Sequence, residues 1–272
     1  MRDFTDEDLK KVLVELLKAT HAFCENHNIT YFLDSGTLLG AIRHKGFIPW
    51  DDDIDICMPR PDYERFIELV QKTPIAEHIY LYHPEDGVNS FLKICDARTK
   101  LIEHTDTLRV ELGVYIDVFP KDGLPNNLKK AKGHCAKAEF YTLWYWFNKY
   151  SVKAWKKTKN IVKKLIAWVA SLFIKDGLYP LRKVRKLAQK YSFYESPYCA
   201  TIVSGGMRNC VPTELFKDKI MVPFEGEYYP APIGYDQYLR KLFAHVNNGE
   251  YMTPPPEKDR IPHKHEIYWI SS

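Results

Sequence analysis

The spacing of hydrophobic and polar positions predicts a helix at the start of the chain and a buried strand behind it. After Thr5, apolar residues recur every three or four positions, which predicts an amphipathic helix with Thr5 as its N-cap. Its apolar stripe consists of Leu9, Val12, Leu13, Leu16, Leu17 and Phe23. Residues 29–33 are apolar, aromatic and β-branched, so they predict a strand. Small polar residues then turn the chain into a short helix over residues 37–42.

The central part of the chain predicts strands on either side of one helix. A strand is expected over residues 53–56, and Pro59 and Pro61 mark the start of a helix over residues 62–72. Beyond that helix, turn signals at residues 83–87 and 96–99 separate short β-rich runs, which predicts a mostly antiparallel meander. The runs are residues 79–83, 90–96, 100–104 and 113–119.

Helical patterns follow Pro120, and the last third of the chain returns to β-like segments. The expected helices are residues 129–147, 155–174, 181–191 and 234–243, and the expected strands are residues 200–204, 220–224 and 228–229, with a tight turn at 225–227. These patterns predict an α+β fold in which helices flank a mixed sheet and a helical lobe is inserted. We expect the core over residues 1–125, the lobe over residues 126–195, and a C-terminal segment, residues 196–272, that completes the core.

The basic charge is concentrated in the expected lobe. Residues 149–190 contain thirteen Lys or Arg and a single acid, Asp176, whereas the whole chain has a net charge of +4. The longest apolar run there, residues 165–174, is too short for a bilayer that needs about 20 residues, but it can lie on a membrane surface. A core-packed lobe with a solvated basic face is an equal alternative. A nucleic-acid surface is less favoured, because no nucleic-acid motif accompanies the charge.

Composition sets further limits. The hydrophobic content of 45% and the charged content of 27% are typical of a globular protein. The six cysteines are spaced singly without a CxxC pair, which favours buried thiols in a reducing compartment over a zinc or redox motif. The N-terminus lacks the basic start and apolar core of a secretion signal. We therefore expect a cytoplasmic protein that can lie peripherally on the inner face of the cell membrane.

Small polar residues follow the first predicted strand. Ser35, Gly36 and Thr37 lie where the short helix is expected to begin, and the first backbone amides of a helix favour an anion. Arg43 follows at the end of the same helix and adds a positive charge. These residues predict a site for a negatively charged group such as a phosphate.

Four aspartates come directly afterwards, within residues 51–55. On a strand, Asp53 and Asp55 would share one face, about 7 Å apart, and would repel each other. A divalent cation, which prefers carboxylate and phosphate oxygens, relieves such repulsion. A solvated acidic loop is the alternative, although the flanking residues are strongly apolar. An EF-hand is not favoured, because its glycine and its final glutamate are missing.

Two further charged residues stand on strands that are otherwise apolar. Asp117 alternates with Val114, Ile116 and Val118, and an unpaired charge there would be costly. It needs either a metal or a basic partner in a buried salt bridge. Lys93 is the only charge within residues 91–95, so its ammonium group should point at a phosphate or an aspartate, or else reach solvent from an edge strand.

The sequence GTLLG at residues 36–40, RH at 43–44 and GFIPWDDDID at 46–55 resembles the signature of the LicD family of bacterial phosphocholine transferases. That family is akin to fukutin-related proteins and is assigned to the nucleotidyltransferase superfamily. The resemblance implies a nucleotidyltransferase-like sheet core. It also implies that Asp53, Asp55 and Asp117 are catalytic residues that hold a divalent metal, Mg²⁺ or Mn²⁺, with Asp117 helping to remove the acceptor's proton.

The resemblance also implies how the donor is bound. The residues expected to bind it are Ser35, Gly36, Thr37, Arg43, Trp50 and Lys93. The glycine and the hydroxyls would contact the diphosphate, the two basic residues would neutralise charge, and Trp50 or Tyr115 could face the choline methyl groups. The superfamily has Gly-Ser where this chain has Ser35, Gly36 and Thr37, which leaves open which hydroxyl touches phosphate.

By the same implication, the enzyme moves phosphocholine from CDP-choline to a sugar hydroxyl of a glycopolymer precursor and releases CMP. The acceptor would be of the teichoic acid or lipopolysaccharide type and linked to a lipid, and no nucleic acid is expected as a partner. Three alternatives remain: a transferase that uses CDP-ribitol or CDP-glycerol, a nucleotidyltransferase that releases pyrophosphate, and a non-catalytic protein that binds lipid-linked polymers.

Overall fold

A computed structural model describes seven segments of the chain. They are residues 4–83, 91–104, 109–157, 177–204, 206–243, 250–256 and 266–270. The helices are α1 (Asp6–Asn26), α2 (Ser35–His44), α3 (Arg60–Lys72), α4 (Leu128–Lys157), α6 (Tyr179–Ala188) and α7 (Tyr235–Leu242), with short 3₁₀ helices η2 (Gly206–Asn209) and η3 (Thr213–Phe216). The strands are β1 (Phe32–Leu33), β2 (Asp55–Pro59), β3 (Ile79–Tyr82), β4 (Leu92–His104), β5 (Arg109–Leu124), β6 (Tyr198–Ala200), β7 (Val211–Pro212), β8 (Lys219–Phe224), β9 (Glu227–Pro232) and β10 (Glu266–Trp269).

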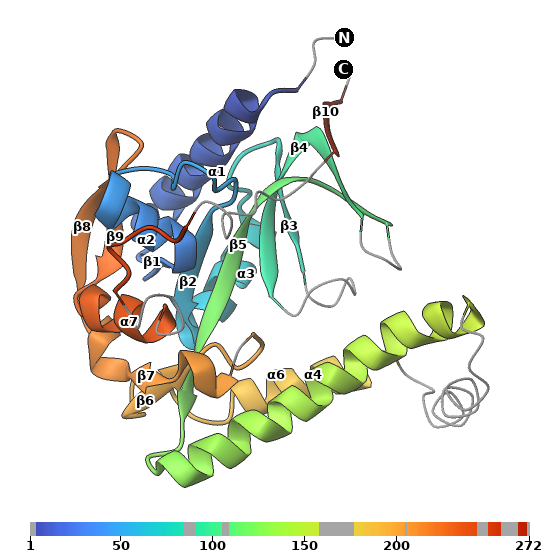
Figure 1. Ribbon diagram of the computed structural model, residues 1–272, viewed down its shortest axis with the longest axis vertical. Coiled ribbons are helices and arrows are strands. Elements are labelled where there is room, and N and C mark those ends of the chain that lie inside the picture. Colours follow the sequence, from blue (N-terminus) through green and yellow to red (C-terminus); the bar gives the residue numbers. More distant parts are fainter. Residues whose placement is uncertain are drawn as a thin grey trace.

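Within the described residues, eight strands form one mixed sheet, and helices flank it (Figure 1). The central order is β1-β2-β5-β4-β10, with β3 also on β4 and with β6 and β7 extending from the end of β5. Strands β2 and β5 are parallel, whereas β4 is antiparallel to β5 and to β3. This arrangement confirms the predicted α+β fold and the antiparallel meander.

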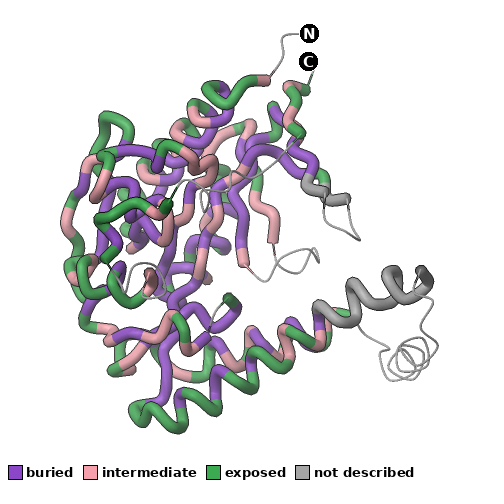
Figure 2. The backbone as a smooth tube through the Cα atoms, in the orientation of Figure 1, coloured by how far each residue is buried: buried purple, intermediate pink, exposed green. Residues whose placement is uncertain are grey.

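The N-terminal helix follows its sequence signals closely. The Thr5 side chain accepts from the Asp8 amide at 3.2 Å, and the Asp8 carboxylate accepts from the Thr5 amide at 3.1 Å, which completes a capping box. The predicted apolar stripe is buried against the sheet, and Figure 2 shows the buried backbone concentrated in these central elements. The first helix therefore covers the sheet as the pattern predicts.

The predicted turn at residues 96–99 is wrong, because β4 runs through it as one strand with a bulge opposite β5. The Asp96 carboxylate accepts from the Arg98 amide at 2.8 Å, and the Thr99 hydroxyl donates to the Asp96 carbonyl at 2.9 Å. The same hydroxyl accepts from the Val114 amide at 2.7 Å, which ties the bulge to β5. Turn-forming side chains here make local hydrogen bonds without reversing the chain.

Several element bounds also differ from the sequence-based expectations. Strand β1 is only two residues long, β2 begins at Asp55 so that Asp53 precedes it, and β6 ends where a strand over 200–204 was expected to begin. The C-terminal hairpin of β8 and β9 has its predicted turn, with Glu225 and Gly226 at φ of 50° and 83°. Helix α7 is confirmed to within one residue at each end.

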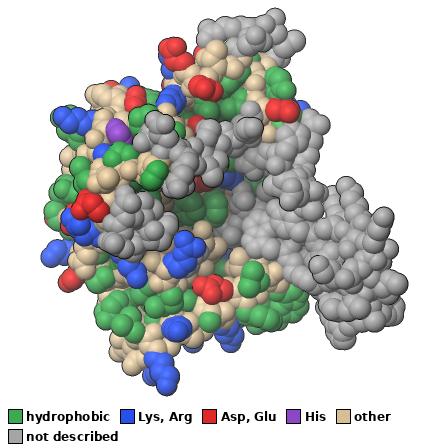
Figure 3. Space-filling model, viewed as in Figure 1, with side chains coloured by type: hydrophobic (Ala, Val, Ile, Leu, Met, Phe, Trp, Pro, Cys, Tyr) green, Lys and Arg blue, Asp and Glu red, His purple; other side chains and the backbone are tan. Residues whose placement is uncertain are grey.

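Helices α4 and α6 pack side by side below the sheet, and α4 extends away from the core (Figure 1). Basic and hydrophobic side chains are interspersed over the lower part of the face shown in Figure 3. The helix expected over 155–174, including the apolar run 165–174, lies outside the described residues from 158 onward. Among the helices that the structure describes, none is long and apolar enough to span a bilayer.

Candidate functional site

Three charged side chains form a row across the middle of the sheet. In the strand register, Asp117 of β5 lies beside Asp55 of β2 on one side and beside Lys93 of β4 on the other. Directly paired residues on neighbouring strands project from the same face of a sheet. The sequence-predicted residues Asp55, Asp117 and Lys93 are therefore brought together although they come from three separate strands.

Lys93 is held at this row by an ion pair and by an aromatic ring. Its ammonium nitrogen lies 2.6 Å from Asp117 Oδ1 and 3.4 Å from the centre of the Tyr115 ring, and the side chain is almost fully buried. Close contact of an ammonium group with an aromatic face is favourable, most of all when both are desolvated. Lys93 thus brings a buried positive charge to the carboxylates instead of reaching solvent.

Helix α2 and strand β2 are joined by reciprocal hydrogen bonds around Asp55. The buried Thr37 hydroxyl accepts from the Asp55 amide at 2.8 Å, and the Asp55 carbonyl accepts from the Asp34 amide at 3.0 Å. The Ile54 carbonyl accepts from the Asp117 amide at 2.9 Å. These bonds fix the start of β2 between the first turn of α2 and β5, so the position of the Asp55 carboxylate is set by backbone contacts.

The carboxylates surrounding Asp55 are close enough to disturb its ionisation. Burial raises the pKa of Asp55 well above its usual range, and the negative charges of Asp53, Asp117, Asp34 and Asp51 raise this pKa further. Asp53 precedes β2 yet still lies within electrostatic reach of Asp55. The arrangement concentrates negative charge at one point, which a cation would relieve.

Asp51 lies against the start of α2. A Cβ atom on Gly36 would come within 2.6 Å of Asp51 Oδ2, so only a glycine leaves room for this carboxylate. Ser35, which precedes Gly36, has a φ of 48°, in the left-handed region that non-glycine residues seldom adopt. Backbone strain and a close approach therefore coincide at the residues predicted to contact a phosphate.

Arg43 and Trp50 lie together near the end of α2. The guanidinium carbon of Arg43 is 5.9 Å from the centre of the Trp50 ring, and the guanidinium donates to the Tyr251 carbonyl at 2.9 Å. The Tyr251 hydroxyl in turn donates to Asp236 of α7 at 2.7 Å. The signature residues Arg43 and Trp50 are thus connected to the C-terminal part of the chain.

A fully buried ionic network supports α2 from behind, and it was not expected from the sequence. Lys121 Nζ lies 2.9 Å from Asp34 Oδ2, donates to the Tyr238 hydroxyl at 2.6 Å and to the Thr201 hydroxyl at 3.2 Å. The Tyr238 hydroxyl also donates to Asp34, the N-cap residue of α2. Burial alone would lower the pKa of Lys121, but the charge of Asp34 and the other neighbouring groups together outweigh burial, and the pKa lies well above its usual value.

A pocket of about 550 Å³ opens beside α2, and the C-terminal third provides half of its lining. The lining residues are Ser35, Gly36, Ile48, Trp50, Asp51, Arg208, Asn209, Lys241, Leu242 and Phe243. Sequence reasoning missed Arg208, Asn209 and Lys241. These three residues lie far from the signature in the chain, and no local motif marks them.

The carboxylate oxygens of Asp53, Asp55 and Asp117 are the type of ligand that a hard divalent cation prefers, although they do not form a closed metal site. Within the segments that the structure describes, no three His, Cys, Asp or Glu side chains are grouped closely enough to hold a metal ion by themselves. Asp55 and Asp117 nevertheless lie beside each other, and like charges raise the pKa of Asp55. A cation that takes its remaining ligands from substrate phosphates fits this donor set.

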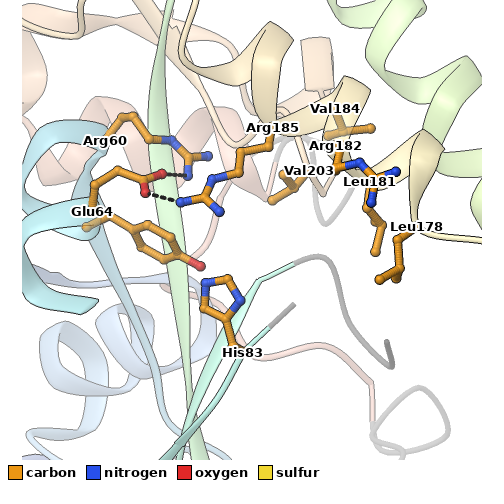
Figure 4. A pocket seen from close by; sticks show the side chains of 10 residues that line it. Arg60, Glu64, His83, Leu178, Leu181, Arg182, Val184, Arg185 and Val203 are labelled. Atoms are coloured by element: carbon orange, nitrogen blue, oxygen red, sulfur yellow. Dashed lines mark hydrogen bonds and ion pairs between the residues drawn. The ribbon is translucent and has the colours of Figure 1, made fainter. Parts of the chain in front are cut away.

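A second pocket lies between α3 and α6, beyond the end of β2 opposite Asp55. Figure 4 shows Arg60, Glu64 and Arg185 pointing toward one another, and Glu64 lies 3.0 Å from Arg60 and 2.7 Å from Arg185. Arg60 also pairs with the buried Asp122 at 2.6 Å. These contacts attach α6 to the core, so we regard this pocket as separate from the carboxylate row.

Comparisons with known proteins identify the family of this chain. Residues 28–91 match the family model described as LicD/FKTN/FKRP, nucleotidyltransferase domain. The chain is 34% identical over 272 residues to the lipopolysaccharide cholinephosphotransferase LicD of Haemophilus influenzae, covering 97% of each protein. It is also 40% identical over 101 residues to the uncharacterized protein RP689 of Rickettsia prowazekii, covering 34% of this chain and 37% of that protein.

Proposed function

This chain belongs to the LicD family, and from that premise we propose that it transfers phosphocholine from CDP-choline to a hydroxyl of a lipopolysaccharide-type glycopolymer precursor. The observation that carries the proposal is the placement of Asp117 beside Asp55, with Lys93 on its other side. The similarity to a lipopolysaccharide cholinephosphotransferase along 97% of both chains supports the choice of substrates.

In the proposed reaction, an acceptor hydroxyl oxygen attacks the phosphorus that carries choline. The new phosphorus–oxygen bond forms as the bond to the bridging oxygen breaks, and CMP leaves with that electron pair. The hydroxyl proton passes to the carboxylate of Asp117. Phosphoryl transfer needs positioning and charge neutralisation more than covalent catalysis, which is what a rigid row of charges on a sheet can provide.

We propose that Asp53, Asp55 and Asp117 hold a divalent cation, Mg²⁺ or Mn²⁺, when the donor is bound. Such an ion would neutralise charge on the phosphate oxygens. Lys93, held in place by Tyr115, would contribute a positive charge from the opposite side of Asp117. Lys93 is buried and the three aspartates are partly buried, which lowers the local dielectric and strengthens their interactions with the donor.

The remaining signature residues would position the donor. Gly36 leaves space for a close approach at the start of α2, and Ser35 is proposed to offer its hydroxyl to the diphosphate. Thr37 holds the Asp55 amide, and a contact of its hydroxyl with phosphate remains a prediction. Arg43 and Trp50 would act from the end of the helix, where the guanidinium adds a positive charge and the indole an apolar surface.

The proposal is tested by incubating the protein with Mg²⁺, CDP-choline and a lipopolysaccharide that lacks phosphocholine. We expect release of CMP and an equal amount of phosphocholine on the polymer. Parallel reactions with CDP-ribitol and CDP-glycerol would identify a different donor. Release of pyrophosphate from CTP, with no CMP from any of these donors, would contradict the proposal.

The variant Asp55→Asn is the matched control for this assay. We expect turnover to fall at least about a hundredfold, because an electrostatic group at the reacting centre is lost. The folded protein should be no less stable, since the substitution removes a carboxylate that its neighbours repel. Unchanged melting with lost turnover would separate a catalytic role from a structural one.

A further inference from the structure

Two basic residues from outside the LicD signature line the pocket beside α2. Arg208 belongs to η2 and Lys241 to α7, and both side chains are exposed. In the part of the chain that the structure describes, neither forms an ion pair. Arg240, which precedes Lys241, does form ion pairs, because it lies 3.0 Å from Asp236 and within reach of Glu250. The pocket wall thus carries two positive charges that the described protein groups do not neutralise.

The wall that carries the signature residues is negative. Asp51 lines the pocket together with Ser35 and Gly36, and the carboxylates of Asp53 and Asp55 follow directly in the chain. The carboxylates alone would repel a phosphate group. A pocket with acids near the reacting centre and cations on η2 and α7 can orient an anionic ligand, with a divalent ion beside the acids and the two cations beside the diphosphate.

We infer that Arg208 and Lys241 bind the diphosphate of the nucleotide donor. This inference rests on the proposed function for the identity of the donor, and it assigns donor recognition to the C-terminal third of the chain. A diphosphate carries two negative charges, which two cations can balance. The guanidinium fork suits bidentate contact with phosphate oxygens, and the ammonium group acts as a point charge.

The size and lining of the pocket fit a nucleotide. Its volume of about 550 Å³ falls in the range of about 300 to 1,000 Å³ that is usual for pockets holding small molecules. Trp50 and Phe243 give it apolar walls, and Arg208 and Lys241 are the positively charged side chains in its lining. Gly36 leaves room for the Asp51 carboxylate in the pocket lining.

The inference is tested by titrating CDP-choline, with cytidine as a ligand that lacks phosphate, into the full-length protein in the presence of Mg²⁺. We expect Arg208→Gln and Lys241→Gln each to raise the Kd for CDP-choline about tenfold, the usual effect of losing one charge-assisted hydrogen bond. Binding of cytidine should not change. Arg208→Lys, which keeps the charge, should recover part of the affinity.

Lys186→Gln is the matched control, because it removes an exposed positive charge from α6, away from the pocket. If the two pocket variants bind CDP-choline as tightly as the control does, the inference is overturned. The proposed function would still stand in that case, provided that the wild-type protein turns over the donor. If the wild type does not bind CDP-choline, inorganic pyrophosphate becomes the probe. Binding of pyrophosphate that both pocket variants weaken would then support the anion site without the proposed donor, and no binding would overturn it.

Discussion

Lys93 provides the positive charge in the row that it forms with Asp117 and Asp55. It is buried, it pairs with Asp117 at 2.6 Å, and Tyr115 covers its ammonium group. A lone lysine in an apolar strand can also mark a side chain that reaches solvent, and the sequence leaves both interpretations open. The register of β4 against β5 decides between them, because it places Lys93 directly beside Asp117.

Gly36 is a residue at which a single methyl group should disturb the candidate site directly. Gly36→Ala would bring a Cβ atom within 2.6 Å of Asp51 Oδ2, so we expect a clear loss of turnover as this carboxylate is displaced. Gly133→Ala in α4 is the control, since nothing lies within 4 Å of the added atom. That change should stabilise the protein by about 0.5 to 1 kcal/mol, as alanine does in helices. Equal turnover for both variants would contradict the packing at Gly36.

His21 provides a test of pH dependence at the residue scale. Burial lowers its pKa below 6.5, and its ring lies 2.8 Å from the Tyr31 hydroxyl. Lys219 lowers this pKa further, whereas Glu25 and Glu227 oppose the shift. The folded protein therefore binds fewer protons than the unfolded chain just below pH 6.5, and stability must fall as the pH falls through that value.

Urea unfolding at pH 7.5 and 5.5 measures this effect. The wild type should lose stability at the lower pH, and His21→Asn should lose less. An identical loss in both proteins would show that other groups control the acid response.

At the scale of elements, α7 and α2 are coupled through the buried network of Lys121, Asp34 and Tyr238. Tyr238→Phe removes a hydroxyl that bonds to both charged groups, so we expect a loss of about 1 to 3 kcal/mol in the free energy of unfolding. Lys121→Met leaves Asp34 buried without its partner and should cost about 3 to 5 kcal/mol. Urea unfolding measures both values, and a cost below 0.5 kcal/mol, roughly that of a surface substitution, would contradict the network's role.

The elements show where local patterns are sufficient. The first helix was predicted closely because its N-cap and its apolar periodicity agree. The turn signal at residues 96–99 failed, since its polar side chains form hydrogen bonds inside a bulge that the partner strand β5 completes. Local sequence cannot reveal that partner.

In the candidate site, too, local sequence predicts some residues and not others. Asp53, Asp55 and Gly36 belong to one contiguous signature that the sequence displays directly. Lys121 and Tyr238 meet Asp34 only through tertiary packing. Lys121, next to Pro120, needs a partner for its buried charge, but the sequence does not show which residue provides it.

At the scale of the whole molecule, α4 extends away from the core (Figure 1) and exposes apolar side chains. Phe140 and Leu143 lie one turn apart on this helix, with 58% and 68% of their surface exposed, among several lysines. Exposed apolar groups beside basic charge are typical of surfaces that contact anionic membranes. A peripheral position on the inner membrane would bring the site to a lipid-linked acceptor, in keeping with the proposed function.

Flotation with anionic vesicles tests this surface. We expect the wild type to float at low salt and to be released at high salt, because the attraction to anionic lipid is screened. The double variant Phe140→Glu with Leu143→Glu should stay in solution. Met221→Glu, which changes an exposed apolar residue on β8, is the control and should float. No flotation of the wild type at low salt would remove the membrane proposal.

The central claim is that the carboxylate of Asp117 works together with that of Asp55, its neighbour in the sheet. The most direct measurement is the rate of CMP release from CDP-choline by Asp117→Asn, compared with wild type at equal and verified folding. We predict a loss of at least about a hundredfold, as for Asp55→Asn. The double variant should lose little more than either single variant, because residues that act as one unit are not additive. Wild-type release by folded Asp117→Asn would contradict the account.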